Sequence, residues 1–286
     1  MKLWILTENS AAGPQFGCEH GWSVLAECRG KRYLFDMGKT DLFLKNARTM
    51  GLDLSQTDAA VLSHGHYDHG GGLGAFLDAN SAAKVWMQAG AERPRFSMRE
   101  EGAAEIGLPA GMLENPRLHT IRGDFLMAEG AMLLSCPAER RYWPRSNRVL
   151  MTREAGAFVC DDFSDEQYLL LEEGGKTVLL AGCSHRGIVN ILRMAVEKTG
   201  RAPDAVIGGF HLSIPHSGES EPPRTVDAVG QELAACPGTV YYTGHCTGEG
   251  AFARLKEILG DRLYAVSAGM KIEIGRGRPS APEKAV

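Results

Sequence analysis

The stretch Ser63–Gly72, with the sequence S-H-G-H-Y-D-H-G-G-G, decides how the rest of this chain is interpreted. It follows the apolar run Ala59–Leu62, which is typical of a short buried strand that ends in a loop. Three imidazoles and one carboxylate then fall within six residues, at His64, His66, Asp68 and His69. Nitrogen and oxygen donors of this kind suit zinc, manganese or iron. The loop therefore predicts a metal site.

The spacing of these donors indicates two metal ions rather than one. His64 and His66 are two residues apart, so they project to the same side of an extended loop. Asp68 and His69 are adjacent, so their side chains must diverge. Three of the nine histidines of the chain lie in this loop, beside an acid and a glycine run, which argues against an incidental polar turn.

Length and composition narrow the class of protein. A chain of 286 residues with 44% hydrophobic content can bury a sizeable core. A net charge of -4 gives no basic surface for nucleic acid, and no apolar run approaches the roughly 20 residues of a membrane span. The seven cysteines are scattered without a C-x-x-C pair, and Glu8 interrupts the apolar N-terminal run. We therefore expect a cytoplasmic protein with reduced thiols and no membrane or nucleic-acid partner.

The order of the expected elements predicts an α/β architecture. Strands are expected at 3–7, 22–28, 32–35, 59–62, 84–87, 131–135, 148–151, 167–171, 177–181, 204–207, 240–242 and 271–274. Helices are expected at 40–50, 72–78, 188–198, 225–235 and 250–259. Residues 93–115 show no clean period and several glycines and prolines, which indicates a cap or insertion within a domain that spans 1–275. We expect the tail 276–286 to be mobile.

Three more histidines, His185, His211 and His245, stand just beyond the ends of expected strands. Ligands gather beyond the carboxyl ends of strands in open α/β sheets, so these side chains can converge on the first cluster. His185 and His245 each follow a glycine and precede a helix, which favours metal ligation. For His211, a metal ligand and a contact to substrate are equally favoured.

Six stretches together resemble the metallo-beta-lactamase superfamily. They are L-F-D-M-G-K at 34–39, S-H-G-H-Y-D-H-G-G-G-L at 63–73, D-D-F-S-D-E-Q-Y-L-L-L at 161–171, G-C-S-H-R-G-I-V-N-I-L at 182–192, G-G-F-H-L at 208–212 and G-H-C-T-G at 244–248. The chain is similar to the branch of metal-dependent hydrolases that includes 7,8-dihydropterin-6-methyl-4-(β-D-ribofuranosyl)aminobenzene-5'-phosphate synthase. This resemblance implies a metallo-beta-lactamase-like αββα four-layer sandwich over residues 1–275.

The resemblance also implies the ligands of two divalent ions, expected to be zinc, with manganese or iron as alternatives. One ion would be held by His64, His66 and His185. The other would be held by Asp68, His69 and His245. Asp36 corresponds to an acid that orients a ligand loop, with an ordinary turn residue as the alternative.

The chain departs from the family pattern at 208–212, where most hydrolases carry an aspartate that bridges the metals. Either His211 or a water alone could take that place. Cys183 and Cys246 stand beside expected ligands and could supply a soft ligand or a reactive thiol, although an inert buried cysteine is favoured. Met37 stands where the family more often has a threonine.

Two features could bind an anionic group. Gly70–Gly72 opens a helix whose amides could favour a phosphate, or it merely permits tight packing. Arg186 could bind phosphate or carboxylate. The same holds for a basic cluster, for which surface solvation is slightly favoured, at Arg140, Arg141, Arg145 and Arg148.

Together these patterns predict a metal-dependent hydrolase that applies a metal-bound hydroxide to a small anionic ester or phosphoester. Asp68 would orient the attacking group, and His211 would stabilise an oxyanion or donate to a leaving group. A synthase-like transferase is one alternative. An iron-dependent redox enzyme is another, although the di-iron reductases of this fold have an acid where this chain has His66.

Overall fold

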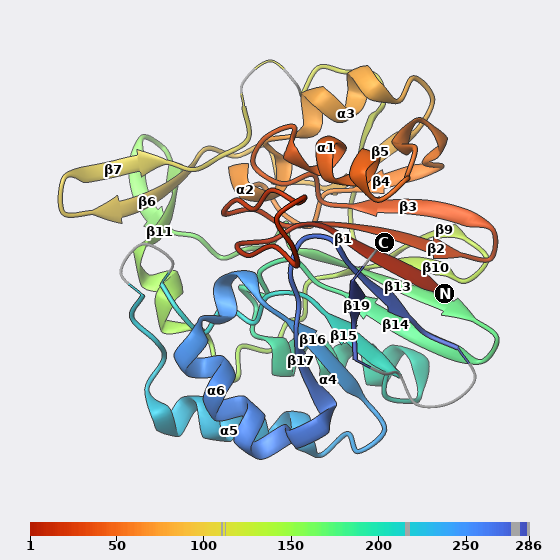
Figure 1. Ribbon diagram of the computed structural model, residues 1–286. Coiled ribbons are helices and arrows are strands. Elements are labelled where there is room, and N and C mark those ends of the chain that lie inside the picture. Colours follow the sequence, from red (N-terminus) through yellow and green to blue (C-terminus); the bar gives the residue numbers. More distant parts are fainter. Residues whose placement is uncertain (110, 112, 215–217, 276–280, 285–286) are drawn as a thin grey trace.

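The computed structural model of the chain describes residues 1–109, 111, 113–214, 218–275 and 281–284. Two β-sheets lie face to face, with helices on the outer side of each, as expected for the αββα sandwich (Figure 1). The first sheet has eight strands in the order β19-β18-β1-β2-β3-β4-β5-β8. In that order their bounds are Glu283–Lys284, Met270–Glu273, Lys2–Thr7, Ser23–Cys28, Lys31–Phe35, Ala59–Val61, Lys84–Gln88 and Leu118–Ile121.

The second sheet has seven strands in the order β17-β16-β15-β14-β13-β10-β9. In that order their bounds are Leu263–Ala265, Val240–Thr243, Ala205–Ile207, Lys176–Leu180, Gln167–Glu173, Ala131–Ser135 and Phe125–Ala128. The edge strands β8, β9 and β17 were not predicted, because each is only three or four residues long and has no clear alternation of polar and apolar residues.

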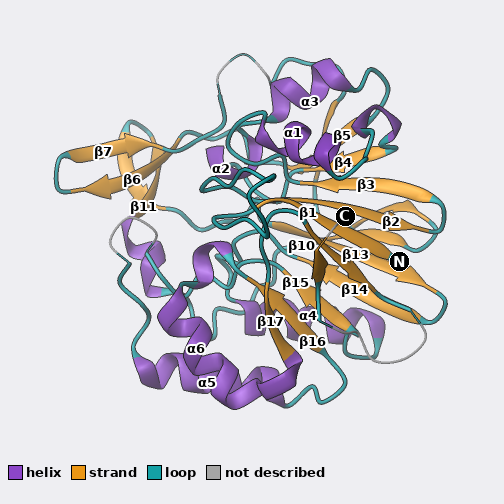
Figure 2. Ribbon diagram, viewed as in Figure 1, coloured by secondary structure: helices purple, strands orange, loops and turns teal. Residues whose placement is uncertain are grey.

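Helices cover both outer faces of the sandwich (Figure 2). On the first sheet lie α1, α2 and α3, at Leu42–Thr49, Tyr67–Gly70 and Leu73–Ala79. On the second lie α4, α5 and α6, at Ile188–Thr199, Pro223–Ala234 and Glu249–Leu259. Short 3-10 turns occur at Leu54–Gln56, Arg145–Val149, His245–Thr247 and Gly260–Arg262.

The strands are apolar on both faces because each sheet is covered on both sides. In β1, Leu3 and Ile5 pack between the two sheets, whereas Trp4 and Leu6 pack under α1 and α3. This alternation follows from the two-residue period of a strand. The result is three stacked apolar layers, which explains why these strands read as continuous apolar runs.

Parallel strands place their carboxyl ends at one edge of the sandwich. Strands β3, β4, β5 and β8 run parallel in the first sheet, and β14 to β17 do so in the second. The loops that follow β3, β4, β14, β15 and β16 carry every candidate ligand and the acid at position 36. The topology therefore brings segments from both halves of the chain to one place.

Residues 93–115, predicted to be an irregular cap, contain two regular strands. Strands β6 (Arg95–Arg99) and β7 (Gly102–Glu105) join β11 (Leu150–Glu154) and β12 (Ala157–Cys160) in a separate antiparallel sheet, here called the cap sheet. Its strand order is β12-β11-β6-β7. The strand expected at 148–151 therefore belongs to the cap sheet rather than to the sandwich. The cap sheet projects from the body of the molecule (Figure 1).

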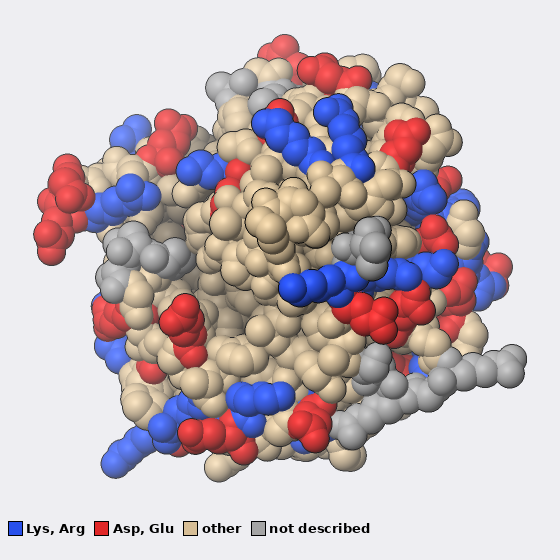
Figure 3. Space-filling view, viewed as in Figure 1, with Lys and Arg blue, Asp and Glu red and all other residues tan. Residues whose placement is uncertain are grey.

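The remaining features of the fold are the tail, the cysteines and the surface charges. Of the tail expected to be mobile, residues 276–280 and 285–286 lie outside the described residues, while β19 pairs with β18. No helix in the described part of the chain is long and apolar enough to cross a bilayer. The seven cysteines, all within the described ranges, are free. Acidic and basic side chains are interspersed on the face shown in Figure 3.

Candidate metal centre

A cavity of about 460 Å³ lies where the carboxyl ends of the parallel strands meet the cap sheet. Its polar lining consists of Asn9, His20, His66, Tyr67, Asp68, Ser97, Arg99, Ser146, Cys183, His185, His211, His245 and Cys246. Its apolar lining consists of Ile106, Val149, Leu150 and Ile214. The predicted ligands therefore stand at or directly behind the wall of one cavity.

One set of nitrogen donors converges from the loops after β4 and β14. The Nε2 atom of His64 lies 3.0 Å from Nδ1 of His66 and 3.2 Å from Nε2 of His185. Burial lowers the pKa of His64 and His185 well below the usual range and that of His66 to about 3. All three imidazoles are therefore neutral at neutral pH, which is the form that binds metals.

The hydrogen bonds of Ser63 identify the nitrogen of His64 that carries the proton. The Ser63 hydroxyl donates to Oδ2 of Asp36 over 2.7 Å, so its oxygen accepts from Nδ1 of His64 over 2.8 Å. The lone pair of His64 Nε2 then points at the other two imidazoles. The Nε2 lone pair of His64 is therefore available to bind a cation.

Two asparagines orient two other histidines in the same way. Asn147 donates its amide to the carbonyl of His185 and accepts at Oδ1 from Nδ1 of that ring, at 2.8 and 3.0 Å. Asn9 makes the same pair of bonds with His245, at 3.2 and 3.1 Å. A carbonyl can only accept, so each amide has one possible orientation and each ring must donate from Nδ1. The Nε2 lone pairs of both rings are left to face the centre.

A second donor set surrounds the carboxylate of Asp68. Its Oδ2 atom lies 3.3 Å from Nε2 of His245 and 3.7 Å from Nε2 of His69. His20, which stacks on the His245 ring, also approaches it to 3.3 Å. Burial would raise the pKa of Asp68, but the charge of His69 and a hydrogen bond from His20 hold it well below the usual range. The second set therefore contains an ionised carboxylate.

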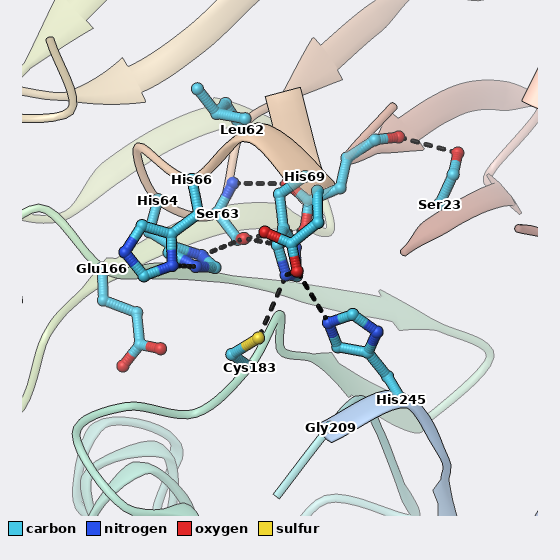
Figure 4. Close-up of polar contacts among 12 residues, drawn as sticks. Ser23, Leu62, Ser63, His64, His66, His69, Glu166, Cys183, Gly209 and His245 are labelled. Carbon is cyan, nitrogen blue, oxygen red and sulfur yellow. Dashed lines mark hydrogen bonds and ion pairs between the residues drawn. The ribbon is translucent and has the colours of Figure 1, made fainter. Parts of the chain in front are cut away.

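The second set attracts positive charge. Burial alone would lower the pKa of His69, but the carboxylates of Asp36 and Asp68 raise it to about 9. The field that favours a proton on His69 equally favours a divalent cation at the same place. Cys183 Sγ lies 3.1 Å from Nε2 of His69 and adds a sulfur to the donors of this set (Figure 4). The residues present thus fit divalent metal ions held by nitrogen, oxygen and sulfur donors.

The comparison with known families agrees with this geometry. The sequence model of the metallo-beta-lactamase superfamily matches residues 17–245. The chain belongs to that superfamily. The crystal structure of Tm1679, a metal-dependent hydrolase of the beta-lactamase superfamily, is similar with a TM-score of 0.82 and 30% identity, covering 96% of this chain and 99% of that one.

Two curated relatives of this metallo-beta-lactamase superfamily chain come from Methanocaldococcus jannaschii. Its 7,8-dihydropterin-6-methyl-4-(beta-D-ribofuranosyl)-aminobenzene-5'-phosphate synthase is 26% identical over 269 residues, which cover 87% of this chain and 88% of the synthase. An uncharacterised protein of the same organism is 28% identical over 209 residues, covering 73% of this chain and 78% of that protein.

Asp36 lies directly behind the two donor sets of this superfamily member. It is completely buried, and its carboxylate accepts from the backbone nitrogen and hydroxyl of Ser63 and lies 2.7 Å from Nδ1 of His69. It touches both ligand-bearing ends of the loop after β4 and faces no solvent. Asp36 thus connects Ser63 and His69, at the two ends of the loop after β4.

Arg186 does not reach the cavity. Its guanidinium group is buried and donates to the carbonyl oxygens of Asp162 and Pro137. The four arginines of the basic cluster are also absent from the lining: Arg141 pairs with Glu232, for example. The sequence could not separate these arginines from one facing the cavity, because charge does not reveal the direction of a long side chain.

The three glycines after His69 serve close packing. A Cβ at Gly71 would clash with the carbonyl oxygen of Lys39, and one at Gly72 would clash with that of Met37. The backbone nitrogens of Gly70, Gly71 and Gly72 already donate to the carbonyl oxygens of His66, Tyr67 and Gly38, so they are not free to hold an anion. Of the two interpretations of this run, the structure supports packing.

His211 stands apart from both donor sets. Its ring packs against His185 with a centroid distance of 4.1 Å, and neither ring nitrogen has a hydrogen-bond partner among the described residues. Among the described residues, the candidate metal group that contains a ring nitrogen of His211 is completed by the sulfurs of Cys183 and Cys246 alone. Its backbone φ of 49° is left-handed, as is that of His245 at 51°, and such backbone conformations concentrate at functional sites.

Sequence reasoning missed several residues that shape the site. Asn9 lies outside the helices and strands and Asn147 lies in the 3-10 turn Arg145–Val149, each distant in sequence from the histidine that it orients. Arg99 lies within 93–115, where no periodic pattern marked it. Glu166 accepts from the backbone nitrogens of His185 and Arg186 and so holds that loop. Of these, only Glu166 had a signal, because it lies within a stretch that resembles the family.

Proposed function

We propose that this chain is a metal-dependent hydrolase that acts on a small anionic ester or phosphoester. The observation that carries the proposal is the convergence of two complementary donor sets, with their protonation arranged by neighbouring side chains, on the wall of one cavity. Two divalent ions, expected to be zinc, would lower the pKa of a water molecule and polarise a carbonyl or phosphoryl oxygen. No serine or cysteine nucleophile is then required.

The protein groups around that water have separable tasks. The ionised carboxylate of Asp68 can bind metal through one oxygen and orient the attacking water by accepting its proton in a hydrogen bond. His211 holds two nitrogen atoms that are buried and unpartnered among the described residues. Unpartnered buried polar atoms are costly, which fits a ring that donates to an oxyanion or a leaving group once substrate is bound.

The cavity supports an anionic substrate with a small organic part. Arg99, at the end of β6, is exposed and lines the cavity, and no hydrogen bond or ion pair to it occurs within the described ranges. A guanidinium group suits carboxylate and phosphate oxygens. Ile106, Val149, Leu150 and Ile214 supply an apolar wall for the remainder of the molecule.

A synthase-like transferase is the second candidate, favoured by the relative of 26% identity that is a dihydropterin synthase. The same donor sets would then serve to polarise a leaving oxygen rather than to activate water. The two candidates differ in their acceptor: water in one, an aromatic amine in the other.

One experiment tests the leading proposal. The protein purified without added metal is analysed for metal content and assayed on chromogenic esters and phosphodiesters, alongside His66→Ala. In the parent we expect about two zinc ions per chain and turnover. In His66→Ala we expect loss of the bound zinc and of turnover, with the fold retained. His119→Ala is the matched control. His119 lies in β8, where its ring packs on Trp86 outside the cavity lining.

An active His66→Ala variant with full metal content would contradict the proposal. Full metal without hydrolysis, together with joining of a dihydropterin that bears a leaving group to a ribofuranosylaminobenzene phosphate and release of that group, would favour the transferase. One iron per chain with a coloured protein would favour redox chemistry instead.

A further inference from the structure

The sulfur of Cys183 belongs to both donor sets. It lies 3.1 Å from Nε2 of His69. It also lies within 4.8 Å of one donor atom each of Asp68, His69 and His245. On its other side it lies within 4.8 Å of one donor atom each of His64 and His185. Among the described residues, it is the one donor shared by these groups, and its side chain is only 3% exposed.

We propose that the thiolate of Cys183 binds both metal ions and so replaces the bridging acid that this chain lacks. The inference rests on the proposed function, because it assumes the two-metal centre. Binding breaks the S–H bond, and the proton passes to solvent as the two metal–sulfur bonds form. No oxidant or reductant is involved.

The segment 208–212 cannot supply the bridge instead. Gly208 and Gly209 carry no side-chain donor, and Phe210 is fully buried in the core beneath α4 to α6. A Cβ at Gly209 would lie 2.5 Å from Sγ of Cys246, so an acid cannot be placed there without moving that cysteine. His211 belongs to neither histidine set and shares a group only with the two cysteines.

Cys246 is a poor rival for the bridging position. Its S–H group donates to the carbonyl oxygen of Cys183 over 3.4 Å, so its hydrogen already has a partner in the protein. It shares no candidate metal group with His64, His69 or His245 in the described part of the chain. Cys246 is equally buried and adjacent, so it provides a matched control for Cys183.

A bridging thiolate has a consequence for the choice of metal. Thiolate sulfur is a soft ligand that favours zinc, cobalt and iron over manganese and magnesium. The sequence left zinc, manganese and iron open on the basis of nitrogen and oxygen donors alone. The position of Cys183 narrows that choice to the softer ions.

Cobalt(II) substitution tests this inference. The protein stripped with chelator is titrated with cobalt(II) in the parent, Cys183→Ser and Cys246→Ser. Visible d–d bands report binding of cobalt, and a near-ultraviolet sulfur-to-cobalt charge-transfer band reports the thiolate. We expect both signals in the parent and in Cys246→Ser. In Cys183→Ser, the charge-transfer band should disappear and the affinity for both ions should fall by more than the roughly 10- to 100-fold that follows loss of an outer partner.

The outcomes separate this inference from the proposed function. No cobalt uptake by the parent would contradict the metal centre itself. Uptake with d–d bands but with the charge-transfer band intact in Cys183→Ser would overturn the bridging thiolate alone. If the affinity for only one of the two cobalt ions fell in Cys183→Ser, the bridge would also be overturned, because Cys183 would then be a ligand to a single metal.

A second measurement does not depend on the folding of Cys183→Ser. X-ray absorption on zinc-loaded Cys246→Ser, in which Cys183 is intact, should show a sulfur neighbour at about 2.3 Å. A first shell made only of nitrogen and oxygen at about 2.0–2.2 Å would refute the proposal.

Discussion

At the scale of single residues, the centre depends on side chains that hold the histidines from behind. Ser63, Asn9 and Asn147 each fix the proton of one imidazole on Nδ1. The side chain that accepts the ring proton decides which nitrogen keeps a free lone pair, so these partners prepare the donors without touching a metal. Phe163 adds to this by stacking on His185 at 4.2 Å with nearly parallel planes.

Replacement of Asn147 by alanine should weaken metal binding while leaving the fold intact. The change removes the acceptor of the His185 ring proton, so the ring can rotate and change tautomer. Loss of such a partner typically costs about 10- to 100-fold in metal affinity, which competition with a chromogenic chelator measures. Asn190→Ala, which removes an amide bonded to the carbonyls of Arg141 and Arg186, serves as the control. Equal metal affinity in Asn147→Ala and the parent would show that the orientation of His185 is set elsewhere.

At the scale of elements, a buried ionic network attaches the cap sheet to the ligand loop. Arg95 in β6 lies 2.6 Å from a carboxylate oxygen of Asp161 and 2.6 Å from one of Asp165. Asp165 in turn accepts from the backbone nitrogen of Gly65, between two of the predicted ligands. The cap and the metal loop are therefore mechanically connected.

Replacement of Arg95 by methionine should destabilise the protein strongly. The guanidinium group and both partner carboxylates are almost completely buried, so the change leaves uncompensated buried charge. Removal of one partner from such a network costs about 3–5 kcal/mol of unfolding free energy. Urea denaturation should show this loss, and Lys45→Met, which removes an exposed ion pair with Asp41, should show none. A similar midpoint for both variants would mean that the network contributes little.

The cap sheet should also determine selectivity through Arg99. With Arg99→Gln, we expect the KM for anionic substrates to rise by roughly tenfold or more, since a hydrogen bond to a charged group contributes about 1.5–3 kcal/mol. The KM for a neutral ester should stay unchanged.

Steady-state kinetics on a matched pair of neutral and anionic esters measures this difference. Arg153→Gln is the control, because that arginine also lies in the cap sheet but packs over Phe96 and Phe158. An equal effect on both esters would assign Arg99 to the fold of the cap rather than to recognition of charge.

At the scale of the whole molecule, the sandwich is held by apolar layers that do not involve the metal centre. Residues such as Leu169, Leu171 and Val178 fill the space between the sheets, and a separate layer lies under each group of helices. The centre occupies one edge of this structure. Metal binding should therefore add stability without being required for folding.

Removal of metal by a chelator should lower the Tm and leave the secondary structure in place. Readdition of zinc at a free concentration of 100 times the dissociation constant should restore about 2.7 kcal/mol per site. Far-ultraviolet circular dichroism and thermal denaturation measure the two effects. Collapse of the circular dichroism signal on chelation would mean that the metals are part of the fold.

Local sequence patterns were sufficient for most elements and for the chemistry of the donors. The helix expected at 188–198 is Ile188–Thr199, and the strands expected at 22–28 and 32–35 are β2 and β3. Apolar periodicity and turn residues act within a few positions, so they can be read locally. The cap sheet was not predicted, because β6 pairs with β11, more than fifty positions later in the chain.

The sequence by itself determined which donors the chain can offer and that they follow strand ends, because residue type and strand pattern are local properties. The tertiary structure decided which atoms face one another. Asn9 meets His245 across 236 positions, and Cys183 Sγ approaches His69 across 114. Such pairs arise because two sheets place the carboxyl ends of distant parallel strands at a common edge, and no local pattern records that proximity.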